Sequence, residues 1–67
     1  MKSREQLEEL GREMSRVTQL LAAVKAKRDI ARVVSAEQAL RRATWAFHEG
    51  DATSVEMCII DLKGLRE

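Results

Sequence analysis

Apolar side chains recur every three or four positions over the first third of the chain, in the spacing of a helix that buries one stripe. The members of this stripe are Leu7, Leu10, Met14, Val17, Leu21 and Val24. Pairs of opposite charge, such as Glu8 with Arg12, flank it as they do on a solvated helix face. The next position of the seam is Arg28, which interrupts it. Because alternating spacings of three and four are typical of a coiled-coil seam, we expect a long N-terminal helix.

Three places carry the pattern of a helix N-terminus, a Ser or Thr followed three residues later by Gln or Glu. They are Ser3 with Gln6, Ser35 with Gln38, and Thr53 with Glu56. Gly50 follows a stretch with apolar helical periodicity, where a left-handed C-terminal cap favours glycine. We therefore expect the chain to reverse at Gly50-Asp51.

Two helical arrangements fit these patterns. One has three helices, at about 4–33, 36–49 and 54–66, and the other has one bent helix over 4–49 followed by a short one. No glycine or proline lies between Arg32 and Ser35 to decide between them. The composition, with one Phe, one Trp, no Tyr and no Pro in 67 residues, disfavours a packed β-sandwich. The predicted fold is all-α: a helical hairpin or three-helix arrangement within a single small domain, residues 1–67.

Each segment also carries a second, smaller apolar face beside its main stripe. If the first helix is continuous, its second face holds Leu20, Ala23, Ile30 and Val34. Trp45 points about 140° away from Leu40, and Met57 and Ile60 lie opposite the last stripe. A chain of this length has no further element to cover these faces, and exposed apolar patches mark interaction sites. We expect the protein not to be a monomer.

The expected partner interface combines these second faces with the basic side chains next to Trp45. Its residues are Leu20, Ile30, Val34, Arg41, Arg42, Trp45, His48, Met57 and Ile60. Trp and Arg are the side chains found most often as binding hot spots, and this favours Trp45 as an anchor. The expected partner is a second copy of the chain or another helical protein.

Charge is distributed unevenly, although twelve basic and eleven acidic residues leave only +1 overall. Residues 25–42 carry six basic against two acidic side chains, and residues 43–67 are net acidic. Lys25, Arg28 and Arg32 share one face of a continuous helix and are candidate phosphate contacts. The alternative function is therefore a small nucleic-acid-binding regulator that uses the basic 25–42 segment. Against it, a helix after Gly50-Asp51 would present Glu56 and Asp61 to the phosphates.

Catalytic and metal chemistry find little support in the sequence. His48 and Cys58 are the obvious candidates, but they lie on different segments without a glycine-rich loop. Cys58 falls on the main apolar stripe of its helix, where a small thiol packs well. His48 stands where a helix C-terminus favours positive charge. We expect no enzyme activity, no cofactor and no metal.

The lone cysteine excludes an internal disulfide framework. No apolar run approaches the ~20 residues of a membrane span, and nothing resembles a secretory signal, so we expect a cytoplasmic protein without a membrane partner. The last apolar stripe still runs at Leu65 without a C-terminal cap, as in a module cut from a longer chain.

Residues 39–65 form a helix, the sequence His48-Glu49-Gly50-Asp51-Ala52 and a second helix, an order that resembles the hairpin of small co-chaperones from type III secretion. The same segment is similar to the last helical hairpin of tRNA-modifying GTPases, through Glu49-Gly50 and Asp61-Leu62-Lys63. It covers under half of the chain, which carries no nucleotide motif, and neither resemblance transfers a functional residue. The expected function is a non-enzymatic assembly module: an adaptor, small regulatory subunit, co-chaperone or structural subunit.

Overall fold

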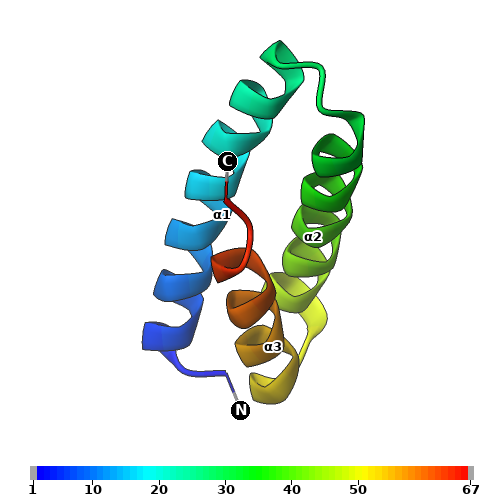
Figure 1. Ribbon diagram of the computed structural model, residues 1–67. Coiled ribbons are helices and arrows are strands. Elements are labelled where there is room, and N and C mark those ends of the chain that lie inside the picture. The colour runs from blue at the N-terminus through cyan, green and yellow to red at the C-terminus, as the bar shows by residue number, and fades with distance from the viewer. Residues whose placement is uncertain (1, 67) are drawn as a thin grey trace.

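Three helices pack side by side in the computed structural model, which describes residues 2–66 (Figure 1). They are α1 (Arg4–Ala26), α2 (Ile30–Glu49) and α3 (Ala52–Lys63). Each helix contacts both others, and no strand forms among the described residues. The molecule measures 39 × 16 × 16 Å. The prediction of an all-α, three-helix arrangement with a long N-terminal helix is confirmed.

The chain reverses between α1 and α2, so the predicted helix over 4–33 and the alternative bent helix over 4–49 are both wrong. Helix α1 ends at Ala26, and Arg28 takes a φ of 59°. This left-handed conformation cannot continue a right-handed helix. Asp29 then caps α2, because its side chain accepts a hydrogen bond from the Arg32 N–H at 3.3 Å. Ser35, the predicted start, lies inside α2.

The chain reverses a second time at Gly50-Asp51, as predicted, but the caps there differ from the expected ones. Gly50 ends α2 with a φ of −77°, which is not left-handed. Asp51, rather than Thr53, caps α3 by accepting a hydrogen bond from the Ser54 N–H at 2.8 Å. That hydrogen bond stabilises the carboxylate and lowers the pKa of Asp51.

Both outer ends of the helical region are also capped. The capping box of Ser3 and Gln6 is present: the Gln6 N–H donates to Ser3 Oγ at 3.1 Å, and the Ser3 N–H donates to Gln6 Oε1 at 3.2 Å. Helix α3 ends at Lys63, three residues before the predicted end, and Gly64 is its C-cap, although no cap was predicted there. Its N–H donates to the carbonyls of Ile60 and Asp61 at 3.2 Å.

The core lies along the line where the three helices meet. Its buried members are Leu10 and Val17 of α1, Ala36, Ala39, Ala43 and Ala46 of α2, and Val55, Ile59 and Leu62 of α3. The α1 stripe predicted from sequence faces this core, with Leu7, Met14 and Leu21 partly buried against it. Alanines on the α2 side leave room for its backbone to approach the larger side chains of α1 and α3.

Cations on α1 and just before it bind the C-terminal ends of the other two helices. Lys2 Nζ donates to the Phe47 carbonyl at 2.9 Å, and Arg16 donates to the carbonyls of Leu62 and Leu65. These carbonyls lie at or just beyond the C-terminal ends of α2 and α3, at the negative end of each helix dipole. The Leu62 carbonyl also accepts a hydrogen bond from the Leu65 N–H at 3.1 Å. In addition, Lys63 pairs with Glu9 at 2.8 Å, which lowers the pKa of Glu9 and raises that of Lys63.

Candidate functional site

Several large apolar side chains remain outside the bundle, on α2 and α3. Their exposed fractions are 75% for Ile30, 46% for Val34, 54% for Trp45, 62% for Met57 and 62% for Ile60. At about 100° per residue, Trp45 points about 180° away from the buried Ala36. The main apolar stripes of the three helices already pack against one another. We call Trp45, Met57 and Ile60 together the outer face.

Trp45 and Met57 lie at about the same height along neighbouring antiparallel helices. Trp45 comes five residues before Gly50, and Met57 comes six residues after Asp51, where the chain has reversed. At 1.5 Å per residue, these separations differ by only about one residue's rise. The outer face therefore comprises exposed residues of both α2 and α3, with Trp45 and Met57 at similar distances from the Gly50-Asp51 turn.

The basic residues predicted to accompany Trp45 are exposed on α2. Arg41, Trp45 and His48 follow one another at spacings of four and three, and so share one face of the helix. His48 also lies edge-on to the Phe47 ring, with ring centroids 5.4 Å apart. Burial raises the pKa of the Cys58 thiol on α3, and the positive charge of Arg42 on α2 acts to lower it.

The break between α1 and α2 separates two groups that a continuous helix would have joined. Leu20 stays on α1, whereas Ile30 and Val34 lie on α2. Of the three candidate phosphate contacts, Lys25 is on α1, Arg28 in the turn and Arg32 on α2. They are exposed, but the expected shared helical face is wrong. Two of them form ion pairs: Lys25 Nζ lies 4.0 Å from Glu37 Oε2, and Arg32 Nε lies 3.3 Å from Asp29 Oδ2.

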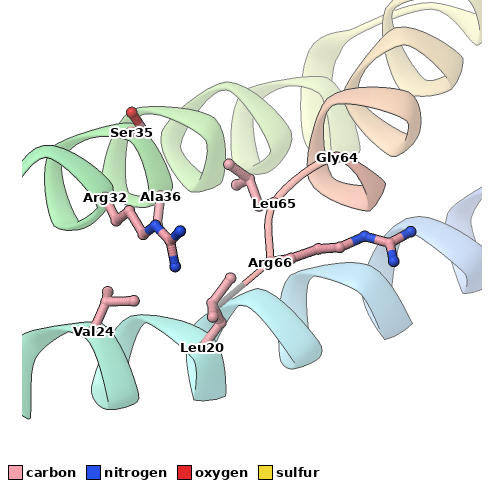
Figure 2. A pocket seen from close by; sticks show the side chains of 8 residues that line it. All are labelled: Leu20, Val24, Arg32, Ser35, Ala36, Gly64, Leu65 and Arg66. Atoms are coloured by element: carbon pink, nitrogen blue, oxygen red, sulfur yellow. The ribbon is translucent and has the colours of Figure 1, made fainter. Parts of the chain in front are cut away.

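A groove opens between α1 and α2 beyond the end of α3 (Figure 2). Its volume is about 260 Å³. We call this site the open groove. It is lined by Leu20, Val24, Arg32, Ser35, Ala36, Gly64, Leu65 and Arg66. Figure 2 shows Leu20 and Val24 on α1, with Arg32 reaching from α2 into the gap between the helices. The structure thus brings together Leu20, which was predicted to contact a protein partner, and Arg32, which was predicted to contact a phosphate of a nucleic acid.

The groove was not predicted from the sequence, because the residues on its floor follow ordinary core stripes. Val24 belongs to the α1 seam and Leu65 to the α3 stripe, and both were expected to be covered by neighbouring helices. The last two helices were predicted at 36–49 and 54–66, nearly equal in length, so no local signal in the sequence indicated the groove. Because α3 is shorter than α1 and α2, part of the α1–α2 pair has no third helix beside it.

The two reactive side chains singled out in the sequence lie on different helices, His48 on α2 and Cys58 on α3. Cys58 is partly buried, and its pKa is raised first by that burial and then by the negative charge of Asp61. Its thiol therefore stays protonated and weakly nucleophilic at neutral pH. No three His, Cys, Asp or Glu side chains within residues 2–66 gather where they could hold a metal ion.

None of the helices in the described part of the chain combines the length and apolarity that a membrane crossing requires. No known family model, no curated protein and no solved structure matches this chain.

Proposed function

We propose that the protein is a non-enzymatic assembly module that binds a second copy of itself through the outer face of α2 and α3. The observation that carries the proposal is that Trp45, Met57 and Ile60 stay more than half exposed, although the main stripes of all three helices are already buried. Removing side chains of this size from water is worth on the order of 1 to 3 kcal/mol each. Binding to another protein surface would remove these side chains from water and so gain that free energy.

The pattern on α3 favours a second copy as the occupant. Along its exposed side, the large Met57 and Ile60 lie between the smaller Thr53 and Gly64, at spacings of four, three and four. The order of side-chain sizes, small, large, large and small, is the same in both directions along the helix. An antiparallel α3 from a second copy therefore places its Ile60 against Met57, and the reverse contact follows from the two-fold axis.

Charge on α3 is complementary in the same arrangement. Glu56 and Lys63 lie on one flank, seven residues apart, and both are exposed. In a two-fold antiparallel pair, equivalent flanks meet with reversed direction, so Glu56 of each copy faces Lys63 of the other. Lys63 already pairs with Glu9, but its ammonium group has three N–H donors and is half-exposed. The ion pairs add orientation more than affinity.

Mass measured by light scattering tests the proposal. We expect a concentration-dependent dimer for the wild type, and a monomer for Ile60→Asp because a charge then lies at the interface centre. Trp45→Ala should weaken association by about 30-fold, the equivalent of a 2 kcal/mol hot spot. Ile30→Asp is the matched control: it is the same change at an exposed isoleucine far from the outer face, and it should leave the mass unchanged.

A wild type that remains a monomer at several hundred micromolar would show that self-association is wrong. Equal dissociation by Ile60→Asp and Ile30→Asp would show that the outer face is not the interface. Within the proposal, the chain serves as an adaptor, small regulatory subunit, co-chaperone or structural subunit. A lone free thiol such as Cys58 is suited to the cytoplasm, where thiols stay reduced.

A second candidate function, nucleic-acid binding, is favoured by the exposed cations Lys25, Arg28 and Arg32 around the α1–α2 turn. If all three contact phosphates, affinity for a duplex should fall about 40-fold between ~50 and ~200 mM salt. Fluorescence anisotropy with a labelled 20-base-pair duplex measures this, and Arg28→Glu should reduce the slope. The absence of binding at 50 mM salt would exclude the candidate, whereas association through apolar burial hardly responds to salt over this range.

A further inference from the structure

Helix α2 ends at Glu49 and α3 begins at Ala52, so only Gly50 and Asp51 connect them. We call the observed conformation of these two residues the closed turn. Their φ angles, −77° and −89°, lie within the α-helical range. Their ψ angles, 164° and −177°, are extended, whereas a helix has a ψ of about −42°. A change in two ψ angles would therefore bring both residues close to helical geometry and join α2 to α3.

The hydrogen bonds on either side of the closed turn already have helical spacing. The Gly50 N–H donates to the Ala46 carbonyl at 3.1 Å, and the Val55 N–H donates to the Asp51 carbonyl at 3.0 Å. The Ser54 N–H donates to Asp51 Oδ1 in the closed turn, and in a continuous helix it would donate to the Gly50 carbonyl. Opening the turn thus replaces the cap of α3 by backbone hydrogen bonds.

The closed turn is crowded at Gly50. A Cβ there would lie 2.8 Å from Ala46 Cα and 3.0 Å from Ser54 Cβ. In a continuous helix the same Cβ would point outward from the backbone, as at any helical position. Glycine is also unfavourable inside a helix relative to alanine. Glycine at position 50 therefore favours the closed turn, and a side chain there favours the open one.

Helix α3 is held in place by contacts with residues far from it in the sequence. Ile59 and Leu62 are buried in the core that the three helices share. Arg16 of α1 donates to the Leu62 carbonyl, and Glu9 of α1 pairs with Lys63 at 2.8 Å. Both α1 residues lie on the other side of the closed turn from α3. An α3 supplied by a second copy would make the same contacts.

We propose that Gly50-Asp51 is a hinge at which two copies of the chain exchange α3. In this exchanged dimer, α2 and α3 form one helix over residues 30–63, about 51 Å long, and α3 of each copy packs on α1 and α2 of the other. Short hinge loops under strain favour such domain swapping. The surface involved is the one that α3 already fits, so the inference does not rest on association through the outer face.

Light scattering in the Ile60→Asp background, which removes association through the outer face, tests the proposal. After refolding from urea at several hundred micromolar, Gly50→Ala in this background should form a dimer. Its dissociation constant should be at least about tenfold below that of Ile60→Asp alone, because each dimer relieves two hinges. Gly11→Ala is the matched control: the same change in the interior of α1 should leave the protein a monomer.

Asp51→Ala is a second hinge variant, and it adds no atom to the crowded position. It removes the cap of α3, so it should also favour the exchanged dimer, even if Gly50→Ala fails to fold. NMR of labelled and unlabelled chains refolded together in equal amounts identifies the contact. We expect NOEs between core side chains of α1 in one copy and core side chains of α3 in the other, because only exchange makes these contacts intermolecular.

Three results would overturn the proposal. They are monomers for both hinge variants after refolding at this concentration, an equal dimer for Gly11→Ala, and a dimer whose NOEs between α1 and α3 stay within one chain. A wild type that does not associate through the outer face would leave this test unaffected, because every variant in it carries Ile60→Asp. Failure of one proposal is thereby distinguishable from failure of the other.

Discussion

Replacing Ile59 by alanine should lower the free energy of unfolding by about 2 to 5 kcal/mol, the range measured for truncating large aliphatic core residues. Ile59 is 1% exposed and belongs to the cluster that joins the three helices. A domain of 67 residues has a total stability of only about 3 to 10 kcal/mol. The substitution is therefore expected to remove a large part of the total stability.

The neighbouring residue gives a matched control for this prediction. Ile60 is 62% exposed, so Ile60→Ala should cost less than about 1 kcal/mol in the monomer. Both changes occur in the interior of α3 and alter helix propensity equally, so the difference reports burial alone. Urea unfolding followed by circular dichroism, at a concentration where the chain is monomeric, measures both. Equal destabilisation would mean that α3 does not present Ile59 to the core.

Gly50→Ala should destabilise the protein by about 1 to 3 kcal/mol, the usual cost of forcing a group into a packed site. A Cβ at this position would lie 2.8 Å from Ala46 Cα and 3.0 Å from both the Ala46 carbonyl oxygen and Ser54 Cβ. Two of these three atoms are backbone, so the α2–α3 turn itself would have to open. Because the φ of Gly50 is −77°, glycine is required by the tight fit of this residue between Ala46 of α2 and Ser54 of α3, and not by a left-handed conformation.

Gly11→Ala is the corresponding control and should have the opposite sign. No atom lies within 4 Å of the Cβ that would be added there, and Gly11 is in the interior of α1. Alanine is more favourable than glycine at such positions by about 0.5 to 1 kcal/mol. Thermal or urea unfolding of the two variants should therefore move in opposite directions. A neutral Gly50→Ala would contradict the tight contact at the turn.

The positions that the sequence could place correctly are those governed by neighbours in the chain. The capping box at Ser3, the apolar seam of α1 and the reversal at Gly50-Asp51 each depend on residues within one or two turns of each other. The break after Ala26 was missed because it has neither glycine nor proline. It depends on Asp29 as a cap and on Arg28 in a left-handed conformation that packing of the hairpin must support.

The candidate surfaces also differ in how far local sequence patterns predict them. The exposure of Trp45, Met57 and Ile60 agrees with their position opposite the main stripes, which helical periodicity alone predicts. The open groove was not predictable in this manner, because it depends on how far α3 extends beside two longer helices. The grouping of Lys25, Arg28 and Arg32 on one face was lost for a related reason, since the turn changes the direction of the chain between them.

The sequence by itself determined that the chain is helical, where α1 begins, which stripes are buried, and that large apolar side chains face outward. Those properties follow from the helical repeat and from short-range hydrogen bonds. Only the tertiary structure decided where α1 gives way to α2, how much of that pair α3 covers, and that Lys2 and Arg16 bind the C-terminal ends of α2 and α3. The Lys2–Phe47 and Arg16–Leu62 contacts join residues 45 and 46 positions apart. Such pairings depend on how helices approach in space, which no local pattern of residues encodes.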